Sequence, residues 1–194
     1  MRTHEIKEYD SVLQTLGEPG CPICTFLKNV QTRLLQAEAS DRIFTLCNFH
    51  TWGIAAVRQA EDAAKIFLSL IDSPFDHENR KCSICLRLEQ EEIFRIRELI
   101  AKLSSRSVAG WLSKHGVLCI PHGLKLRAEA PESVRDLIDA VVSRTSREMR
   151  TALTRLIAEA AHGSTGHSGV LGRAAEYLVA QRGISLVRDQ QVIW

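Results

Sequence analysis

The chain has 194 residues, of which 45% are hydrophobic and 25% are charged, and its formal net charge is +2. This composition is typical of a folded globular chain and excludes an intrinsically disordered one. The length suits one ample domain or two small ones. The nearly neutral charge gives no global attraction to nucleic acid or to anionic lipid, so such binding would need a local basic patch.

No segment approaches the ~18 consecutive apolar residues of a membrane span, and the first residues lack the apolar run of a signal peptide. We therefore expect a cytoplasmic protein that does not bind membranes. In the reducing cytoplasm, six cysteines are more consistent with metal ligation than with three disulfides.

Apolar residues recur at spacings of three and four along most of the chain, which predicts an all-α fold. The expected helices run from residue 5 to 17, from Cys24 to about Ser40, from His50 to Ser73, from about Glu89 to Leu103, from Pro131 to Ala160, and from Leu171 to Gly183. Ser104, Ser105 and Gly110 loosen the helical pattern before Trp111, and a long loop is expected before Cys119. Residues 185–194 fit a small hairpin or an extended tail.

One pattern occurs twice in the same order: a Cys-x2-Cys pair followed by a Cys-x2-His pair. The first occurrence consists of Cys21, Cys24, Cys47 and His50, and the second consists of Cys82, Cys85, Cys119 and His122. All six cysteines are used. Each set supplies three thiolates and one imidazole, the ligands of one four-coordinate site for a soft metal ion. We expect each occurrence to close its own site, as two duplicated Cys3His units, and each pair to lie at the start of a helix.

Zinc fits this ligand set best, because it accepts three thiolates and one imidazole in tetrahedral geometry. Two zinc ions would bring the net charge to about zero, since three thiolates and one divalent ion carry −1 per site. An iron–sulfur cluster at each site is the alternative cofactor. A redox dithiol is a weaker interpretation of the cysteine pairs, and His115 is a weaker candidate ligand than His122.

Three other features of the sequence bear on function. Arginines on the long helix at 144, 147, 150 and 155 offer a possible nucleic-acid contact, although a solvated helix face is the plainer interpretation. His162 and His167 flank a glycine-rich stretch, and Glu159 lacks the partner ligands of a di-iron site. The chain contains no phosphate-binding glycine loop, zinc-protease motif or serine elbow, so we identify no catalytic residue and favour a protein that is not an enzyme.

The paired Cys-Pro-Ile-Cys and Leu-Cys-x2-His motifs, between Cys21 and His122, resemble those of an uncharacterised bacterial family of helical proteins, a domain of unknown function. The resemblance implies a bacterial, metal-binding protein and supplies no reaction.

We therefore predict one helical bundle. Residues 1–74 would hold an N-terminal helix and the first Cys3His unit, residues 75–130 the second unit, and residues 131–194 a long helix, a short helix and a tail. The predicted function is a zinc-stabilised scaffold or adaptor that binds another protein. The alternatives are an iron–sulfur protein for electron transfer or redox sensing, and a nucleic-acid-binding regulator.

Overall fold

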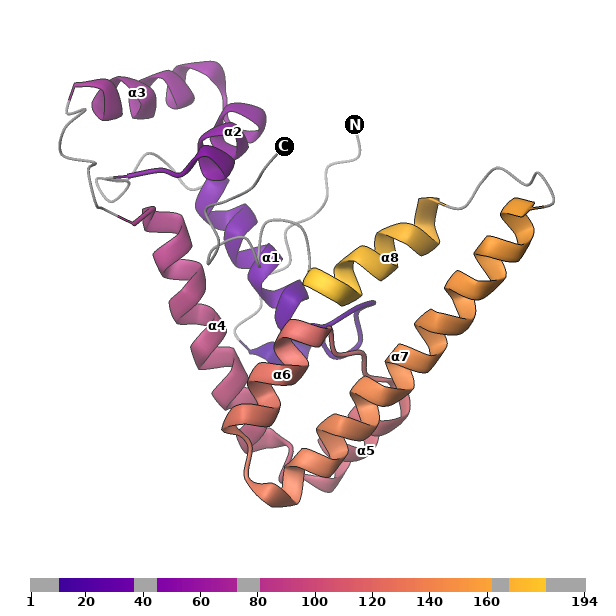
Figure 1. The fold of residues 1–194 in the computed structure, drawn as a ribbon. Helices are drawn as coiled ribbons and strands as arrows, with labels where there is room; N and C mark the ends of the chain where they lie inside the picture. Colours follow the sequence, from indigo (N-terminus) through magenta and orange to yellow (C-terminus); the bar gives the residue numbers. More distant parts are fainter. Residues whose placement is uncertain (1–10, 37–44, 73–80, 162–167, 181–194) are drawn as a thin grey trace. The chain divides into compact units, whose positions relative to one another are not determined.

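The protein is all α-helical in a computed structural model, which describes residues 11–36, 45–72, 81–161 and 168–180 (Figure 1). These residues contain no strand, which confirms the predicted fold class. The elements are η1 (Val12–Thr15), α1 (Pro22–Gln36), α2 (Asn48–Val57), α3 (Ala60–Ile71), α4 (Ser83–Lys102), α5 (Arg106–His115), α6 (Ile120–Glu129), α7 (Glu132–Ala161) and α8 (Ser168–Val179). None of these helices is long and apolar enough to cross a membrane.

Contacts divide the chain into two compact units. Unit 1 comprises residues 1–8 and 27–92, and unit 2 comprises residues 9–26 and 93–194. Two of the boundaries between the units fall inside helices, one in α1 and one in α4. The division of the chain into segments 1–74, 75–130 and 131–194 remains a prediction.

Unit 1 is built from most of α1, from α2 and α3, and from the first half of α4. Its buried apolar side chains include Leu27, Leu35, Ile54, Ile66 and Leu88. The single long helix expected between His50 and Ser73 is two helices, because the backbone of Arg58 is extended between α2 and α3. The Arg58 Nε donates to the Leu35 carbonyl at the end of α1, which holds this break in place.

Unit 2 is organised by α7, which packs against α5, α6 and α8. The buried side chains Leu99, Leu112, Leu126 and Ile138 come from four different helices of this unit. Helix α7 continues through the mostly polar residues 143–148. Within them Thr145 is buried, and its hydroxyl donates to the Val141 carbonyl.

The prediction of a long loop before Cys119 is wrong, because most of this segment forms helix α5. Ser105 is the N-cap residue of α5 and Gly116 is its C-cap residue, so two residues that resemble loop signals mark the ends of a helix. The Arg144 guanidinium donates to the carbonyls of Ser113 and Gly116 and thereby satisfies the end of α5.

Some predictions concern residues outside the described part of the chain. They are most of the N-terminal helix, the end of the second helix at Ser40, His162, His167, the Gly183 cap and the tail from residue 185. Tertiary packing decides which residues of α8 are buried: Ala174 and Tyr177 are buried, whereas Leu171 and Leu178 are exposed.

Candidate metal centres

Eight side chains form two groups of four, and they are the eight that the sequence predicts as ligands. Site A consists of Cys21, Cys24, Cys119 and His122, and site B consists of Cys47, His50, Cys82 and Cys85. Within each group all ligand atoms lie within 4.8 Å of one another. Site A lies wholly in unit 2, and site B lies wholly in unit 1.

The predicted pairing of the ligands is wrong. Each Cys-x2-Cys pair was expected to share its site with the next Cys-x2-His pair along the chain. The structure instead nests one site inside the other: the first and last pairs meet at site A, and the two middle pairs meet at site B. His122, and not His115, belongs to site A, as expected; His115 is exposed on α5 and packs beside Trp111.

The order of the segments along the chain shows how the sites are nested. Helix α1 carries Cys24 near its start and, about two turns later, Gln31, which contacts His50 of site B. The chain closes site A only after α4 and α5. Longer closure costs little extra entropy, because that cost grows only with the logarithm of loop length.

Every ligand pair lies at the start of a helix, as predicted. Cys47 and Cys119 are the N-cap residues of α2 and α6, and Cys21 and Cys82 directly precede α1 and α4. Helix N-termini carry unpaired N–H groups and a partial positive charge, which favours thiolates.

Site A is fully buried. The exposed fractions of its four residues are 5% for Cys21, 1% for Cys24, 2% for Cys119 and 1% for His122. His122 Nδ1 lies 3.5, 3.2 and 3.1 Å from the sulfurs of these three cysteines in that order, and the sulfurs of Cys24 and Cys119 are 3.6 Å apart.

Site B has nearly the same geometry but is less enclosed, because Cys47 and Cys85 are half-buried. His50 Nδ1 lies 3.3 Å from the sulfurs of Cys47 and Cys82 and 3.4 Å from that of Cys85. The sulfurs of Cys47 and Cys85 are 3.7 Å apart. Thr45 joins the two ligand-bearing segments, because its carbonyl accepts from the Ser83 N–H and its hydroxyl donates to the Lys81 carbonyl.

Because the sulfur atoms of each site lie close together, the pKa values of their thiols are shifted in opposite directions. At site B, hydrogen bonds with Cys47 and Cys85 hold the pKa of the Cys82 thiol far below its usual range, and the Cys85 N–H adds to this effect. Hydrogen bonds to Cys47 and Cys82 raise the pKa of the Cys85 thiol. Burial opposes the cationic form of His50, but hydrogen bonds with Cys47 and Cys82 outweigh it and raise the pKa of His50 to about 9.

Site A follows the same principle. Burial acts to raise the pKa of Cys21, but hydrogen bonds with Cys119 and Cys24 outweigh it and hold this pKa well below its usual range. Hydrogen bonds to Cys119 and Cys21 raise the pKa of Cys24. A divalent ion supplies the positive charge that lets all three thiols of such a site ionise together.

Sequence reasoning missed Gln31. It is 7% exposed, and its amide nitrogen lies 3.2 Å from His50 Nε2. An imidazole that ligates through Nδ1 carries its proton on Nε2, so the amide oxygen of Gln31 accepts that proton after a half-turn of the amide. The available signal was a polar residue on the apolar stripe of α1, one turn after Leu27.

The arginines of α7 are partly engaged within the protein. Besides the Arg144 contacts with α5, Arg155 donates to Glu159 on the next turn of α7 at 2.6 Å. These two side chains therefore have intramolecular partners at the positions where the sequence offered a phosphate contact.

No family model matches the chain, and neither a curated protein nor a solved structure is similar to it. The resemblance of the cysteine motifs to an uncharacterised bacterial family therefore stays a prediction.

Proposed function

We propose that the protein binds two structural zinc ions and acts as a helical scaffold that docks another protein. The observation that supports metal binding most directly is the convergence of four soft ligands at each site, from segments far apart in the sequence. An unloaded protein would gain little from burying six thiols in two tight groups. Loaded with metal, each group would join two ligand-bearing segments through one ion.

The spacing of the ligand atoms favours single ions over clusters. Zinc–sulfur bonds of ~2.3 Å and zinc–nitrogen bonds of ~2.0–2.1 Å place tetrahedral ligands about 3.8 Å apart for two sulfurs and about 3.6 Å apart for sulfur and nitrogen. The observed separations are 3.6 and 3.7 Å between sulfurs and 3.1–3.5 Å between sulfur and nitrogen. A cluster of several irons would spread its protein ligands further apart.

The role assigned to zinc is structural, because four protein ligands leave no coordination position for a substrate. Binding of zinc to such a site contributes ~10–16 kcal/mol of apparent free energy near pH 7, which is comparable to the whole stability of a domain. The residues of this chain supply the charge, the enclosure and the orientation: helix N-termini face the thiolates, and Gln31 holds the His50 ring.

The scaffold part of the proposal is supported by apolar side chains that α2 and α3 expose. Trp52 is 69% exposed, Leu68 59% and Ile71 68%. Isolated exposed apolar residues are ordinary, but large ones on two adjacent helices are typical of protein-binding surfaces. We expect Trp52→Ser with Leu68→Ser to abolish capture of the partner without changing zinc content or helicity. Equal capture by parent and variant would remove this part of the proposal.

The experiment that tests the metal assignment is elemental analysis with a visible spectrum on protein purified without air. We expect about two zinc ions per chain and no visible absorbance, and loss of helical circular dichroism after removal of the metal with a chelator and a thiol-reactive mercurial. Iron with sulfide and visible absorbance would favour the iron–sulfur alternative. A metal-free protein with unchanged helicity and melting temperature would contradict the structural role.

A further inference from the structure

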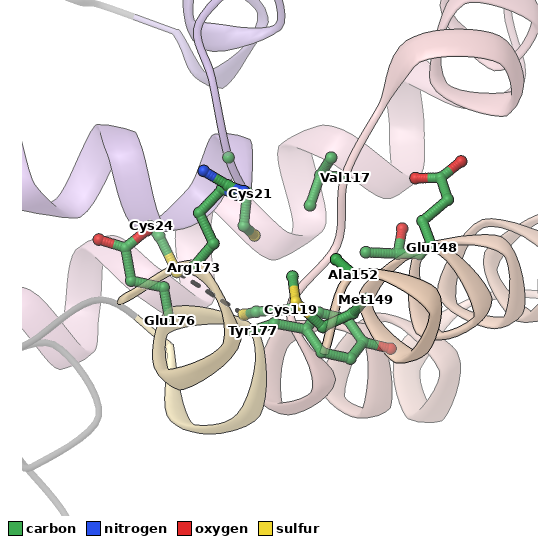
Figure 2. Close-up of a pocket in the computed structure, with 12 residues that line it drawn as sticks. Cys21, Cys24, Val117, Cys119, Glu148, Met149, Ala152, Arg173, Glu176 and Tyr177 are labelled. Atoms are coloured by element: carbon green, nitrogen blue, oxygen red, sulfur yellow. Dashed lines mark hydrogen bonds between the residues drawn. The ribbon is translucent and has the colours of Figure 1, made fainter. Parts of the chain in front are cut away.

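One face of site A borders a cavity of about 310 Å³ within unit 2 (Figure 2). Its walls come from the start of α1, from the segment before α6, and from α7 and α8. This volume lies at the lower end of the ~300–1,000 Å³ range of small-molecule sites. A structural metal site needs no cavity beside it, so the metal-binding role leaves this space unexplained.

The inner part of the cavity is apolar and soft. The three cysteines of site A line it together with Met149, Ala152 and Tyr177. The Tyr177 hydroxyl is already engaged, because it hydrogen-bonds with Ser146 and lies 3.2 Å from the Val142 carbonyl. The tyrosine therefore offers mainly its ring to a ligand, and thioether and aromatic groups suit an aliphatic or thioether side chain.

Charged side chains of both signs flank this apolar interior. Arg173 and Glu176 come from neighbouring turns of α8, and Glu148 comes from α7. Figure 2 shows Arg173 and Glu176 together on the α8 side and Glu148 on the α7 side. Glu148 has a partner in Arg144, whose Nε is 3.7 Å away. Neither Arg173 nor Glu176 makes an ion pair or hydrogen bond with any other residue that the structure describes.

We propose that this cavity binds a small zwitterion with an apolar body, the chemistry of a free hydrophobic α-amino acid. The Arg173 guanidinium pairs with the ligand carboxylate, and the Glu176 carboxylate pairs with the ligand ammonium. The ligand side chain packs against Met149 and Tyr177. This binding function is separate from the zinc scaffold, although it uses the side of site A that faces α7 and α8.

Ligands with a single charge fit less well. An apolar anion would pair with Arg173 but bring a second negative charge beside Glu176. An apolar cation would pair with Glu176 but bring a second positive charge beside Arg173. Arg173 and Glu176 are both exposed to solvent, so the cost of each mismatch is the repulsion between the two like charges. A purely apolar molecule would leave both groups unpaired.

The test is isothermal titration calorimetry of the full chain with L-leucine and three matched probes. Isocaproate lacks the ammonium, isopentylamine lacks the carboxylate, and glycine lacks the apolar side chain. Each lost charged hydrogen bond or buried side chain lowers affinity by about tenfold or more. We therefore expect L-leucine to bind at least about tenfold more tightly than any of the three probes.

Variants locate the binding in the cavity. Arg173→Gln should weaken L-leucine binding and, by removing a like charge, strengthen isopentylamine binding. Glu176→Gln should weaken L-leucine binding and strengthen isocaproate binding for the same reason. Ala152→Phe should fill the cavity and abolish binding. Lys65→Gln, on exposed α3 in unit 1, is the control and should bind as the parent does. The two charge variants keep the test valid if the larger phenylalanine prevents folding.

Zinc content is measured on every sample, which separates this inference from the proposed metal sites. The inference is overturned if the zinc-loaded chain gives no binding heat up to about 10 mM L-leucine. Equal affinity for L-leucine and any one of the three probes would overturn it as well. In either case two bound zinc ions per chain would still support the structural role of the metal.

Discussion

At the scale of single residues, Gln31 decides how firmly the His50 ring is held at site B. Its amide is the only group that any described contact places against His50 Nε2. Partners of this kind fix the tautomer and orientation of a metal-binding imidazole. We expect Gln31→Leu to lower the zinc affinity of site B by ~10–100-fold, measured by competition with a chelating dye.

Thr32 provides the matched control, because it follows Gln31 on α1 and its hydroxyl donates to Lys28 within the same helix. Thr32→Ala should leave zinc affinity unchanged. Indistinguishable affinities for the two variants would mean that the Gln31 contact does not support the metal.

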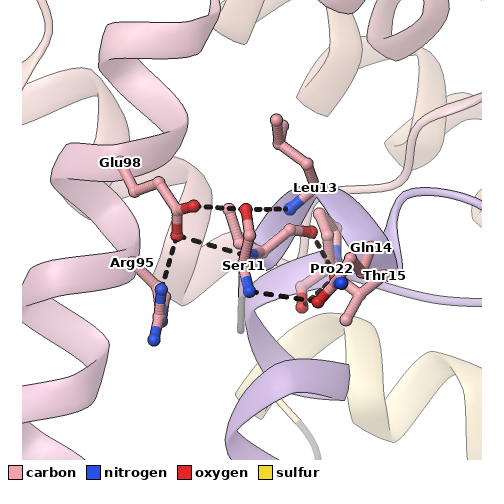
Figure 3. A network of polar contacts seen from close by, with 8 residues as sticks. Ser11, Leu13, Gln14, Thr15, Pro22, Arg95 and Glu98 are labelled. Carbon is pink, nitrogen blue, oxygen red and sulfur yellow. Dashed lines mark hydrogen bonds and ion pairs between the residues drawn. The ribbon is translucent and has the colours of Figure 1, made fainter. Parts of the chain in front are cut away.

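Glu98 is the residue that attaches η1 to α4 in unit 2 (Figure 3). Its carboxylate accepts from the Ser11 hydroxyl, from the Val12 N–H at 3.2 Å and from Arg95 at 2.9 Å. Burial acts to raise the pKa of Glu98, but the hydrogen bonds from Ser11 and Arg95 outweigh it and lower this pKa below 4.5. The depressed pKa means that the ionised carboxylate stabilises the fold above its unfolded pKa, and that this stability is lost as the pH falls through the folded value.

We therefore expect Glu98→Gln to lower the free energy of unfolding at pH 7, with a difference from the parent that narrows as the pH falls below 4.5. Glu61→Gln, at an exposed position on α3, is the control and should show a small effect. Ser11→Ala, which removes the capping side chain of η1, should cost about 1 kcal/mol. Denaturant titration across pH measures all three, and a difference for Glu98→Gln that is constant with pH would contradict the assignment.

At the scale of helices, the close approach of α6 and α7 depends on Gly123. A Cβ atom at this position would lie 2.6 Å from the Val142 side chain, so a methyl group forces that side chain or the two helices to shift. Gly123 also follows the site A ligand His122. We expect Gly123→Ala to destabilise the protein by ~1–3 kcal/mol, in spite of the higher helix propensity of alanine.

Gly110 in α5 provides the opposite case, because a Cβ there would have no neighbour within 4 Å. Gly110→Ala should stabilise the protein by ~0.5–1 kcal/mol through helix propensity alone. Thermal unfolding of both variants compares the two effects, and a loss of stability at Gly110 as large as that at Gly123 would refute the packing explanation.

At the scale of the whole molecule, double variants separate the nested arrangement of sites from the consecutive one. Cys24 shares site A with Cys119, whereas Cys47 belongs to site B. Cys24→Ser with Cys119→Ser should therefore leave one zinc ion per chain. Cys24→Ser with Cys47→Ser should leave none, because it damages both sites. Consecutive pairing predicts the reverse result, and elemental analysis distinguishes the two.

The eight side chains that gather into the two groups, and the helix starts beside them, could be predicted from local sequence. Six cysteines at regular spacing with two histidines leave few other interpretations, and a thiolate is favoured at a helix N-terminus wherever that helix packs. The ends of α5 carried equally local signals in Ser105 and Gly116, which sequence reasoning interpreted as a loop.

The sequence by itself determined an all-α chain and the eight side chains that form the two sites. The tertiary structure alone decided which ligands share a site, that Gln31 supports His50, and that a cavity borders site A. The physical reason is that ligand type and helix formation depend on neighbouring residues. Which Cys-x2-Cys pair meets which Cys-x2-His pair instead depends on where the helices bring distant segments together. The entropy of loop closure distinguishes nested from consecutive pairing only weakly.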